Sequence, residues 1–186
     1  RRLLQPWGLL LVVEPAQREA AEALRSCSDH LIQEGVFHNW GPYLHSAPCP
    51  LLQPSGRFWT HEVRNWAPND SLLRLSQKLG RNLHELKFSY SLLGRSPRVG
   101  WEADPGFFRL VSPISRMKGA YLASGVASDG NVHVYDFQHR DFSSSDRAWI
   151  RGLQRGDVLK VQTLKDHQQP RFHRVNRMED LTLRYT

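Results

Sequence analysis

The stretch Gly119-Ala-Tyr-Leu-Ala-Ser-Gly-Val-Ala-Ser-Asp-Gly-Asn-Val-His-Val-Tyr-Asp-Phe137 predicts a β-hairpin. Asp129-Gly130 separates two runs of strand-forming residues, and Asp-Gly favours the tight hairpin turns that need positive φ. After the turn, aliphatic residues alternate with an imidazole and two aromatic rings, from His133, Tyr135 and Phe137. Successive side chains of a strand point to opposite faces, so these three share one face. That face is either an ordinary barrel face or a platform on which bases stack.

The segments around the hairpin predict a small barrel. We expect one long, bent strand from Phe107–Ile114 and Gly119–Ala127, and a second strand over Val132–Phe137. A short helix capped by Ser143–Asp146 follows, and then come strands over Val158–Val161 and Leu181–Tyr185. This order is typical of the five-stranded Greek-key barrel of the OB type. The Gly- and Pro-rich segment from Gly94 to Gly106 predicts a boundary between two domains, 1–97 and 105–186.

The residues before this boundary predict a mixed α/β region. Leu9–Val13 is a continuous aliphatic run, which suits a strand covered on both faces, as in a parallel sheet. Pro15 is expected to begin a helix over Ala16–Glu34 that ends at Gly35, with Cys27 buried on its apolar stripe. Strands are expected over Tyr43–Ala47 and Phe88–Leu93, with a short helix from Asp70 to Leu79 between them. Glu14 either faces a pocket at the end of its parallel strand, or caps the helix or forms a surface pair.

Composition narrows the class of protein. A formal net charge of +7 indicates either a solvated basic surface or a polyanionic partner, most often nucleic acid. With only Cys27 and Cys49, a disulfide framework is excluded and a reducing interior is expected. No apolar run reaches 18 residues, so we expect no transmembrane helix and no membrane partner. The first residue is not Met, and we expect a fragment or a processed product.

Five stretches occur in an order that resembles a known family. They are Leu9–Pro15, Ala47-Pro48-Cys49-Pro50, Trp59-Thr60-His61, Lys87-Phe88-Ser89-Tyr90, and Phe108-Arg109-Leu110 with Lys118-Gly119. Together they resemble the C-terminal half of the ribosomal small-subunit methyltransferase-like family of mitochondria and bacteria. The resemblance implies an α+β fold, with the C-terminal part of a class I methyltransferase-like α/β domain followed by a small OB-like β-barrel. It also implies association with rRNA or the small ribosomal subunit, in a mitochondrial matrix or a bacterial cytoplasm.

Two departures from the family bear on cofactors. The half of the sheet that would carry the glycine-rich loop is absent from the sequence, so S-adenosylmethionine binding is expected only if an N-terminal half exists. The family's further cysteines, which look like iron–sulfur ligands, are also missing: only Cys49 matches, and Thr60 follows Trp59 in place of a Cys. One thiolate cannot hold a cluster that takes four ligands, so we predict no iron–sulfur cluster and no metal. His61 is expected to be a hydrogen-bonded structural residue.

The residues of the hairpin and its flanks are the candidate RNA-binding residues. No catalytic residue is predicted, and whether the chain belongs to an enzyme is left open. Cationic and aromatic side chains in this region suit RNA contact; they are Arg116, Lys118, Tyr121, His133, Tyr135, Phe137, His139 and Arg140. Arg171, His173, Arg174 and Arg177 could extend the path.

Three functions remain open from the sequence. The first is the rRNA- or small-subunit-binding part of a methyltransferase-like ribosome assembly protein, not catalytic by itself. The second is a stand-alone RNA- or protein-interaction module with no methyltransferase activity. A hydrolase that uses Cys49 and His61 as nucleophile and base is the third. The oligomeric state is not predicted.

Overall fold

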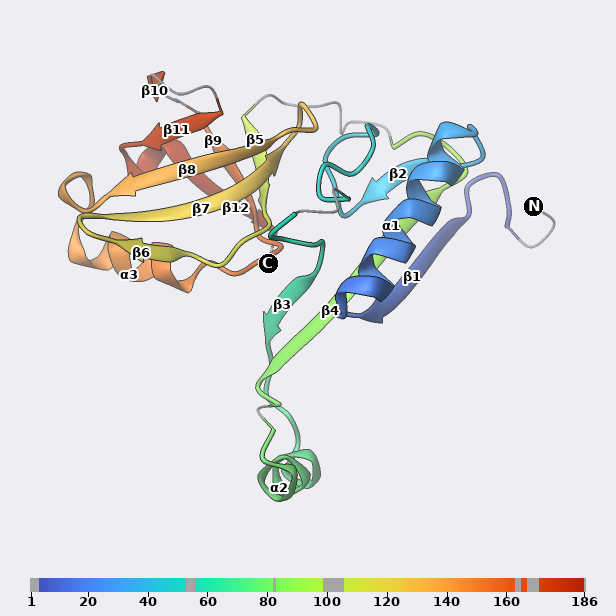
Figure 1. The fold of residues 1–186 in the computed structure, drawn as a ribbon, viewed down its shortest axis with the longest axis horizontal. Coiled ribbons are helices and arrows are strands. Elements are labelled where there is room, and N and C mark those ends of the chain that lie inside the picture. The colour runs from blue at the N-terminus through green and yellow to red at the C-terminus, as the bar shows by residue number, and fades with distance from the viewer. Residues whose placement is uncertain are drawn as a thin grey trace.

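The structure is a computed structural model that describes residues 4–52, 56–81, 83–98, 106–162, 165–166 and 171–185. It is a mixed α+β fold made mostly of strands, with three α-helices among these residues. The strands form two sheets that lie side by side, and the second sheet curls into a half-barrel (Figure 1). The predicted boundary segment falls largely on 99–105, outside the described residues. No helix among the described residues is long and apolar enough to cross a membrane.

The first sheet is built around its longest strand, β4 (Glu85–Gly94). Strand β1 (Leu9–Pro15) pairs with one edge of β4, and β2 (His38–Gly41) and β3 (Glu62–Asn65) pair with it as well. All these pairings are antiparallel, so the predicted parallel setting of the aliphatic run is wrong. The predicted strand over Tyr43–Ala47 is also wrong, because the strand lies earlier, in β2.

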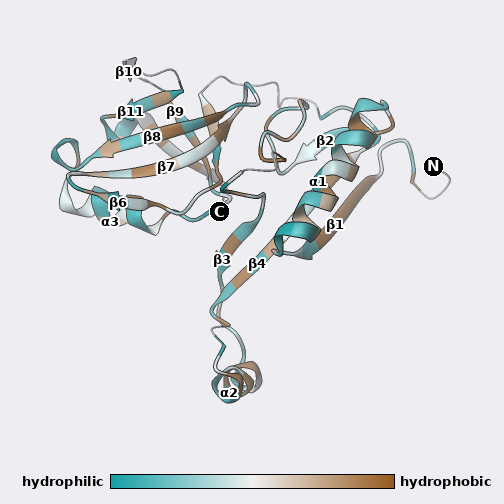
Figure 2. Cartoon of the chain, viewed as in Figure 1, coloured by the Kyte–Doolittle hydropathy of each residue, from teal (hydrophilic) through white to brown (hydrophobic). Residues whose placement is uncertain are grey.

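One face of β1 is exposed, whereas its continuous run of apolar residues predicts a strand covered on both faces. Burial alternates along the strand, and Leu9, Leu11 and Val13 are 45%, 59% and 55% exposed. The hydropathy colouring in Figure 2 shows β1 as an apolar band at the side of the molecule. Helix α1 covers the other face of the sheet, so these three side chains have no cover among the described residues.

Helix α1 (Arg18–Gln33) packs on β4 through small and polar side chains. Ala21, Arg25 and Ser28 are its buried residues. The Ser28 hydroxyl bonds the Ser91 hydroxyl at 2.8 Å, and the Arg25 guanidinium donates to the Tyr90 carbonyl at 3.2 Å. Because these side chains face β4, the predicted apolar stripe does not. Cys27 is therefore exposed, and its predicted burial is wrong.

Local signals fix the ends of the two helices in this half. The first turn of α1 follows Gln17 rather than Pro15, since Pro15 still belongs to β1. The helix ends before Gly35, whose φ of +64° suits glycine. Helix α2 (Asp70–Leu79) begins after Asn69, whose side chain accepts from the Leu72 amide at 3.0 Å, and ends at Gly80. It joins β3 to β4 and lies at the tip of the arm they form (Figure 1).

The second sheet has the order β10-β11-β8-β7-β5-β9-β12, with β6 also beside β7. Its strands are β5 (Phe107–Leu110), β6 (Ser115–Met117), β7 (Ala120–Ala127), β8 (Val132–Gln138), β9 (Val158–Val161), β10 (Lys165–Asp166), β11 (Phe172–Val175) and β12 (Leu181–Tyr185). Among the described residues, only the β8–β11 pair of this sheet is parallel. Both β5 and β6 run antiparallel to β7, so 107–127 is not the single bent strand that the sequence predicts.

Helical turns complete this half of the chain. The 3₁₀ turn η1 (His139–Asp141) and helix α3 (Ser144–Gly152) link β8 to β9, and η2 (Met178–Asp180) precedes β12. The predicted cap of α3 is confirmed as a capping box, in which Ser143 and Asp146 each bond the other's backbone amide.

The predicted hairpin is confirmed, and one of its faces fills the core of the half-barrel. Gly130 has φ +80°, and Tyr121 and Ala123 of β7 pair with Phe137 and Tyr135 of β8. The rings of Tyr135 and Phe108 stack with centroids 3.6 Å apart. Gly125 makes this possible, because a Cβ there would lie 2.6 Å from the Phe108 ring. The aromatic face of the hairpin is therefore structural.

Candidate nucleic-acid interface

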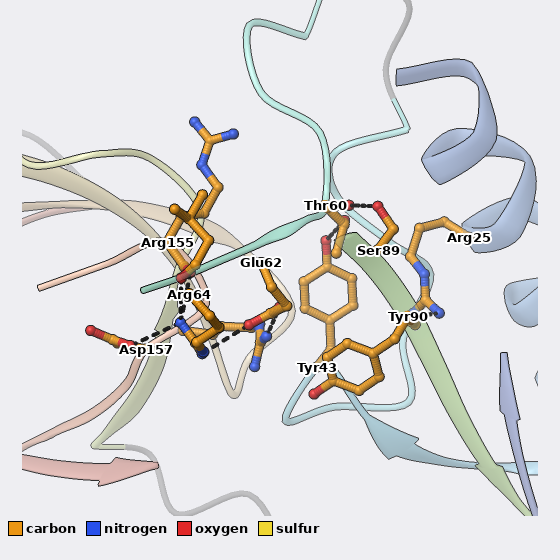
Figure 3. Close-up of polar contacts among 11 residues, drawn as sticks. Arg25, Tyr43, Thr60, Glu62, Arg64, Ser89, Tyr90, Arg155 and Asp157 are labelled. Atoms are coloured by element: carbon orange, nitrogen blue, oxygen red, sulfur yellow. Dashed lines mark hydrogen bonds and ion pairs between the residues drawn. The ribbon is translucent and has the colours of Figure 1, made fainter. Parts of the chain in front are cut away.

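A buried ionic network joins the two sheets. Glu62 of β3 forms an ion pair with Arg109 of β5, and its other oxygen accepts from Arg64 at 2.9 Å. Arg64 also reaches Asp157, in the turn before β9, at 3.1 Å (Figure 3). The Val63 amide donates to the Arg155 carbonyl at 3.1 Å. Strand β3 thus belongs to one sheet and is bonded to the other.

The charges of this network balance each other inside the protein. Glu62, Arg109 and Asp157 are 3%, 5% and 5% exposed. Buried charges are tolerated when they are paired and hydrogen-bonded, as these are. Gly156 gives the Glu62 carboxylate its space, because its φ is +96° and a Cβ there would collide with that carboxylate. The network is therefore a structural joint.

Beside this joint lies a groove of about 630 Å³ between β3, β4 and the end of α3. Its lining includes two rings and three cations, from Trp59, His61, Lys87, Arg151 and Arg155, together with the carboxylate of Glu85. Lys87 and Glu85 form an exposed ion pair at 3.0 Å. The Trp59 indole N–H donates to the Ala16 carbonyl at 2.9 Å, which fixes the ring at the groove wall. A groove that combines aromatic residues with cations is typical of sites that bind single-stranded nucleic acid.

Arg155 is held at the groove by neutral partners. Its guanidinium donates to His61 Nε2 at 2.6 Å and lies 5.9 Å from the centre of the Trp59 ring. Burial, and then the Arg155 charge, lower the pKa of His61 to about 4. His61 is therefore neutral at pH 7 and accepts this bond, which confirms that it is a hydrogen-bonded structural residue. Figure 3 shows the Arg155 guanidinium pointing away from the joint, so its charge is not balanced there.

Arg147, Arg151 and Arg155 follow one another at intervals of four residues, in α3 and the turn after it, and we call them the α3 basic stripe. Among the described residues, none of the three forms an ion pair with a carboxylate. Arg151 lines the groove and also a second hollow of about 240 Å³. The stripe therefore connects two hollows with charges that no acidic side chain of the described residues neutralises.

The predicted aromatic platform is wrong for its three rings. Tyr121, Tyr135 and Phe137 are 4%, 2% and 0% exposed and belong to the core, so no base can stack on their faces. Burial also raises the pKa of Tyr135. His133 is buried too: its Nε2 lies 3.0 Å from an Asp129 oxygen, and its Nδ1 is 2.7 Å from Nε2 of His173. These four residues, which were predicted to bind RNA, therefore stabilise the fold.

The polar members of the predicted site lie at the end of the half-barrel. Arg116, Lys118 and Arg140 are exposed, and Arg140 has a 3.8 Å contact with Asp141. Arg116 and His139 line the second hollow, together with the edge of Tyr121. Arg174, expected to extend the path, is instead bonded to Asp136 at 3.1 Å. The cations thus gather around α3 and not on the outward face of β7 and β8.

Sequence reasoning missed the stripe and the groove. The spacing of Arg147 and Arg151 was a readable signal, since four residues make about one helical turn, whereas Arg155 lies beyond the end of α3. The contribution of Trp59 and Lys87 had no local signal, because it depends on β3 packing against a turn about 90 residues later in the chain.

The cysteines do not fit a metal cluster or a nucleophile. The Cys49 thiol is buried, 3.1 Å from the Tyr43 hydroxyl and 3.7 Å from that of Thr60, while Cys27 is exposed on α1. His61 is bonded to Arg155 and not to Cys49. The described residues contain no group of three His, Cys, Asp or Glu side chains that could hold a metal ion. Glu14 pairs with Ser89 within the antiparallel sheet, so the first of its two predicted roles, facing a pocket at the end of a parallel strand, is wrong.

A scan against protein-family models and a search of curated proteins return no match to this chain. The fold, the groove and the stripe therefore carry the functional inference.

Proposed function

We propose that the protein binds single-stranded RNA along the α3 basic stripe and the adjoining groove. In this proposal it is the rRNA- or small-subunit-binding part of a methyltransferase-like ribosome assembly protein, not catalytic by itself, in a mitochondrial matrix or bacterial cytoplasm. The observation that carries RNA binding is the set of three arginines without acidic partners, which joins two hollows. Cations of this kind contact phosphates, and the groove adds the Trp59 ring.

We further propose that the half-barrel is of the OB type. The order of its strands supports this: when the short β6, which lies off the main path of the sheet, is left out, β8 is the third strand and β9 the fourth, and helix α3 lies between them. The last segment runs parallel to β8 in β11 and antiparallel to β9 in β12. OB barrels bind oligonucleotides on the face of strands two and three. Here the ligand would lie at the end of the barrel, because Asp136 and Arg174 neutralise each other on the outward side of β8.

The assignment of the first sheet to a class I methyltransferase-like domain remains part of the same proposal. The strand β4, antiparallel to β1 and β2, is compatible with the terminal strands of such a domain. S-adenosylmethionine would then require residues outside this chain.

The exposed leucines of β1 favour the second candidate, a protein-interaction module, because exposed apolar faces commonly mark contact surfaces.

Fluorescence anisotropy with a labelled single-stranded RNA of about 12 nucleotides tests RNA binding. The variant Arg147→Ala/Arg151→Ala should weaken binding at least about tenfold, since charge-assisted contacts are lost. Arg74→Ala/Lys78→Ala is the matched control, because it also removes two cations four residues apart on a helix, here α2. Equal affinity of the two double variants would overturn the proposal.

A further inference from the structure

The smaller hollow has the make-up of an anion pocket. It lies between α3, the turn η1 and the β6–β7 pair, and its volume is about 240 Å³. Its lining consists of Arg116, Tyr121, His139, Ser144, Arg147 and Arg151. Three guanidinium groups, an imidazole and a hydroxyl line it, and no carboxylate does. An uncompensated concentration of positive charge of this kind favours an anionic ligand.

The donors of this pocket are not used elsewhere in the described part of the chain. Arg116, Arg147 and Arg151 have no ion pair there. The Nε2 atom of His139 is buried and has no hydrogen-bond partner. A buried polar atom without a partner costs free energy, but solvent does not reach this atom, so the three guanidinium groups are the donors open to a ligand.

The fold fixes the backbone elements that carry these donors. The His139 amide donates to the Gly119 carbonyl at 2.8 Å, which holds η1 against the β6–β7 turn. The ring of His139 packs on Tyr121, with centroids 4.5 Å apart. On the other side, the capping box of Ser143 and Asp146 fixes the first turn of α3, and Arg147 and Arg151 follow one turn apart.

We propose that this hollow binds a phosphomonoester, namely the terminal phosphate of an RNA strand. A phosphomonoester carries a charge of about −1.5 to −2 at pH 7, against −1 for an internal diester, and so matches three guanidinium groups better. Arg151 also lines the groove, so a strand anchored here by its end continues directly into the groove. The choice of RNA as the carrier of the phosphate rests on the proposed function, whereas the phosphate site does not.

The first experiment compares RNA ends. Anisotropy titrations use one oligonucleotide sequence with a 5′-phosphate, a 3′-phosphate or hydroxyls at both ends, labelled internally. A terminal phosphate should tighten binding by about tenfold, the value of a charge-assisted contact. Arg116→Gln should abolish this ratio, while the matched Arg74→Gln on α2 should retain it. Circular dichroism checks that both variants fold. Equal affinity for all three ends overturns the inference.

The second experiment uses no RNA, so that the two proposals fail separately. Phosphorus NMR and thermal unfolding follow inorganic phosphate at constant ionic strength, with Arg116→Gln and Arg74→Gln beside the wild type. A phosphate response that is lost only in Arg116→Gln supports the pocket, even if RNA does not bind and the proposed function fails. RNA binding without any phosphate response overturns the pocket and leaves the proposed function. Tighter binding of a phosphoserine peptide than of 5′-phosphorylated RNA overturns RNA as the ligand.

Discussion

The arginines of the joint and the arginines of the α3 basic stripe differ in the side chains that surround them. At the joint, Arg64 and Arg109 are bonded to Glu62 and Asp157. Along α3, the arginines of the basic stripe face two hollows and have no acidic partner among the described residues. The joint neutralises its own charges and the stripe does not. The arginines of the joint thus hold the two sheets together, whereas the arginines of the stripe are available to a polyanion.

The largest effect is expected at the joint. Glu62→Gln leaves Arg109 buried without its counter-charge, and breaking a buried pair in this way costs about 3–5 kcal/mol. Glu22→Gln is the control, because Glu22 belongs to an exposed helix pair with Arg18 and should cost less than about 0.5 kcal/mol. Urea unfolding measures both. Equal losses in the two variants would mean that the joint does not differ from a surface pair.

The next effect is a pH dependence that His61 introduces beside Arg155. The folded pKa of His61, about 4, lies below its unfolded value, so the unfolded state binds the extra proton. The stability contributed by the neutral ring is complete above about pH 6.5 and is lost as the pH falls to 4, by up to about 3 kcal/mol. Unfolding of wild type and His61→Gln between pH 7 and 4 isolates this contribution. Parallel curves for the two proteins would show that His61 is not buried against Arg155.

The stripe should behave in the opposite way to the joint. Arg147→Ala/Arg151→Ala removes no ion pair, and its stability should stay within about 0.5 kcal/mol of wild type for each substitution. Urea unfolding beside Glu62→Gln makes the contrast direct. A loss as large as that of Glu62→Gln would show that the stripe is structural and would remove the distinction between the two groups of arginines.

The smallest effect is a change in salt dependence. Each phosphate contact on single-stranded nucleic acid contributes about −0.7 to the slope of log affinity against log salt. The double variant of the stripe should therefore reduce the magnitude of the slope by about 1.4, and the double variant of Arg74 and Lys78 should not. Anisotropy titrations at several salt concentrations give the slopes. An unchanged slope in the stripe variant would show that these arginines do not contact phosphate.

Local chemistry in the sequence predicted much of the fold. The Asp129-Gly130 hairpin, the capping box of Ser143 and the glycine stop at Gly80 depend on residues near in the chain, and all three are found. Alternation also placed His133, Tyr135 and Phe137 on one face. It could not tell whether that face turns inward, because this depends on α3 and β5 packing over it. For that reason the predicted stacking platform was wrong.

Features that depend on distant contacts could not be predicted. The aliphatic run of β1 has the composition of a strand buried on both faces, yet α1 covers only one of them. Helix α1 uses Arg25 and Ser28 against β4, so its apolar stripe gave the wrong face. The groove requires β3 to meet the turn that carries Arg155, about 90 residues further along the chain. These features depend on contacts between segments far apart in the chain, so the spacing of apolar residues within each segment does not reveal them.

Photo-cross-linking of the bound RNA, with the linked peptides identified by mass spectrometry, tests most directly whether RNA lies along the α3 basic stripe. We expect cross-links in the peptides that contain Trp59 and residues 144–155, with few in α2. Cross-links confined to α2 or to the outward side of β8 would contradict RNA binding at the stripe.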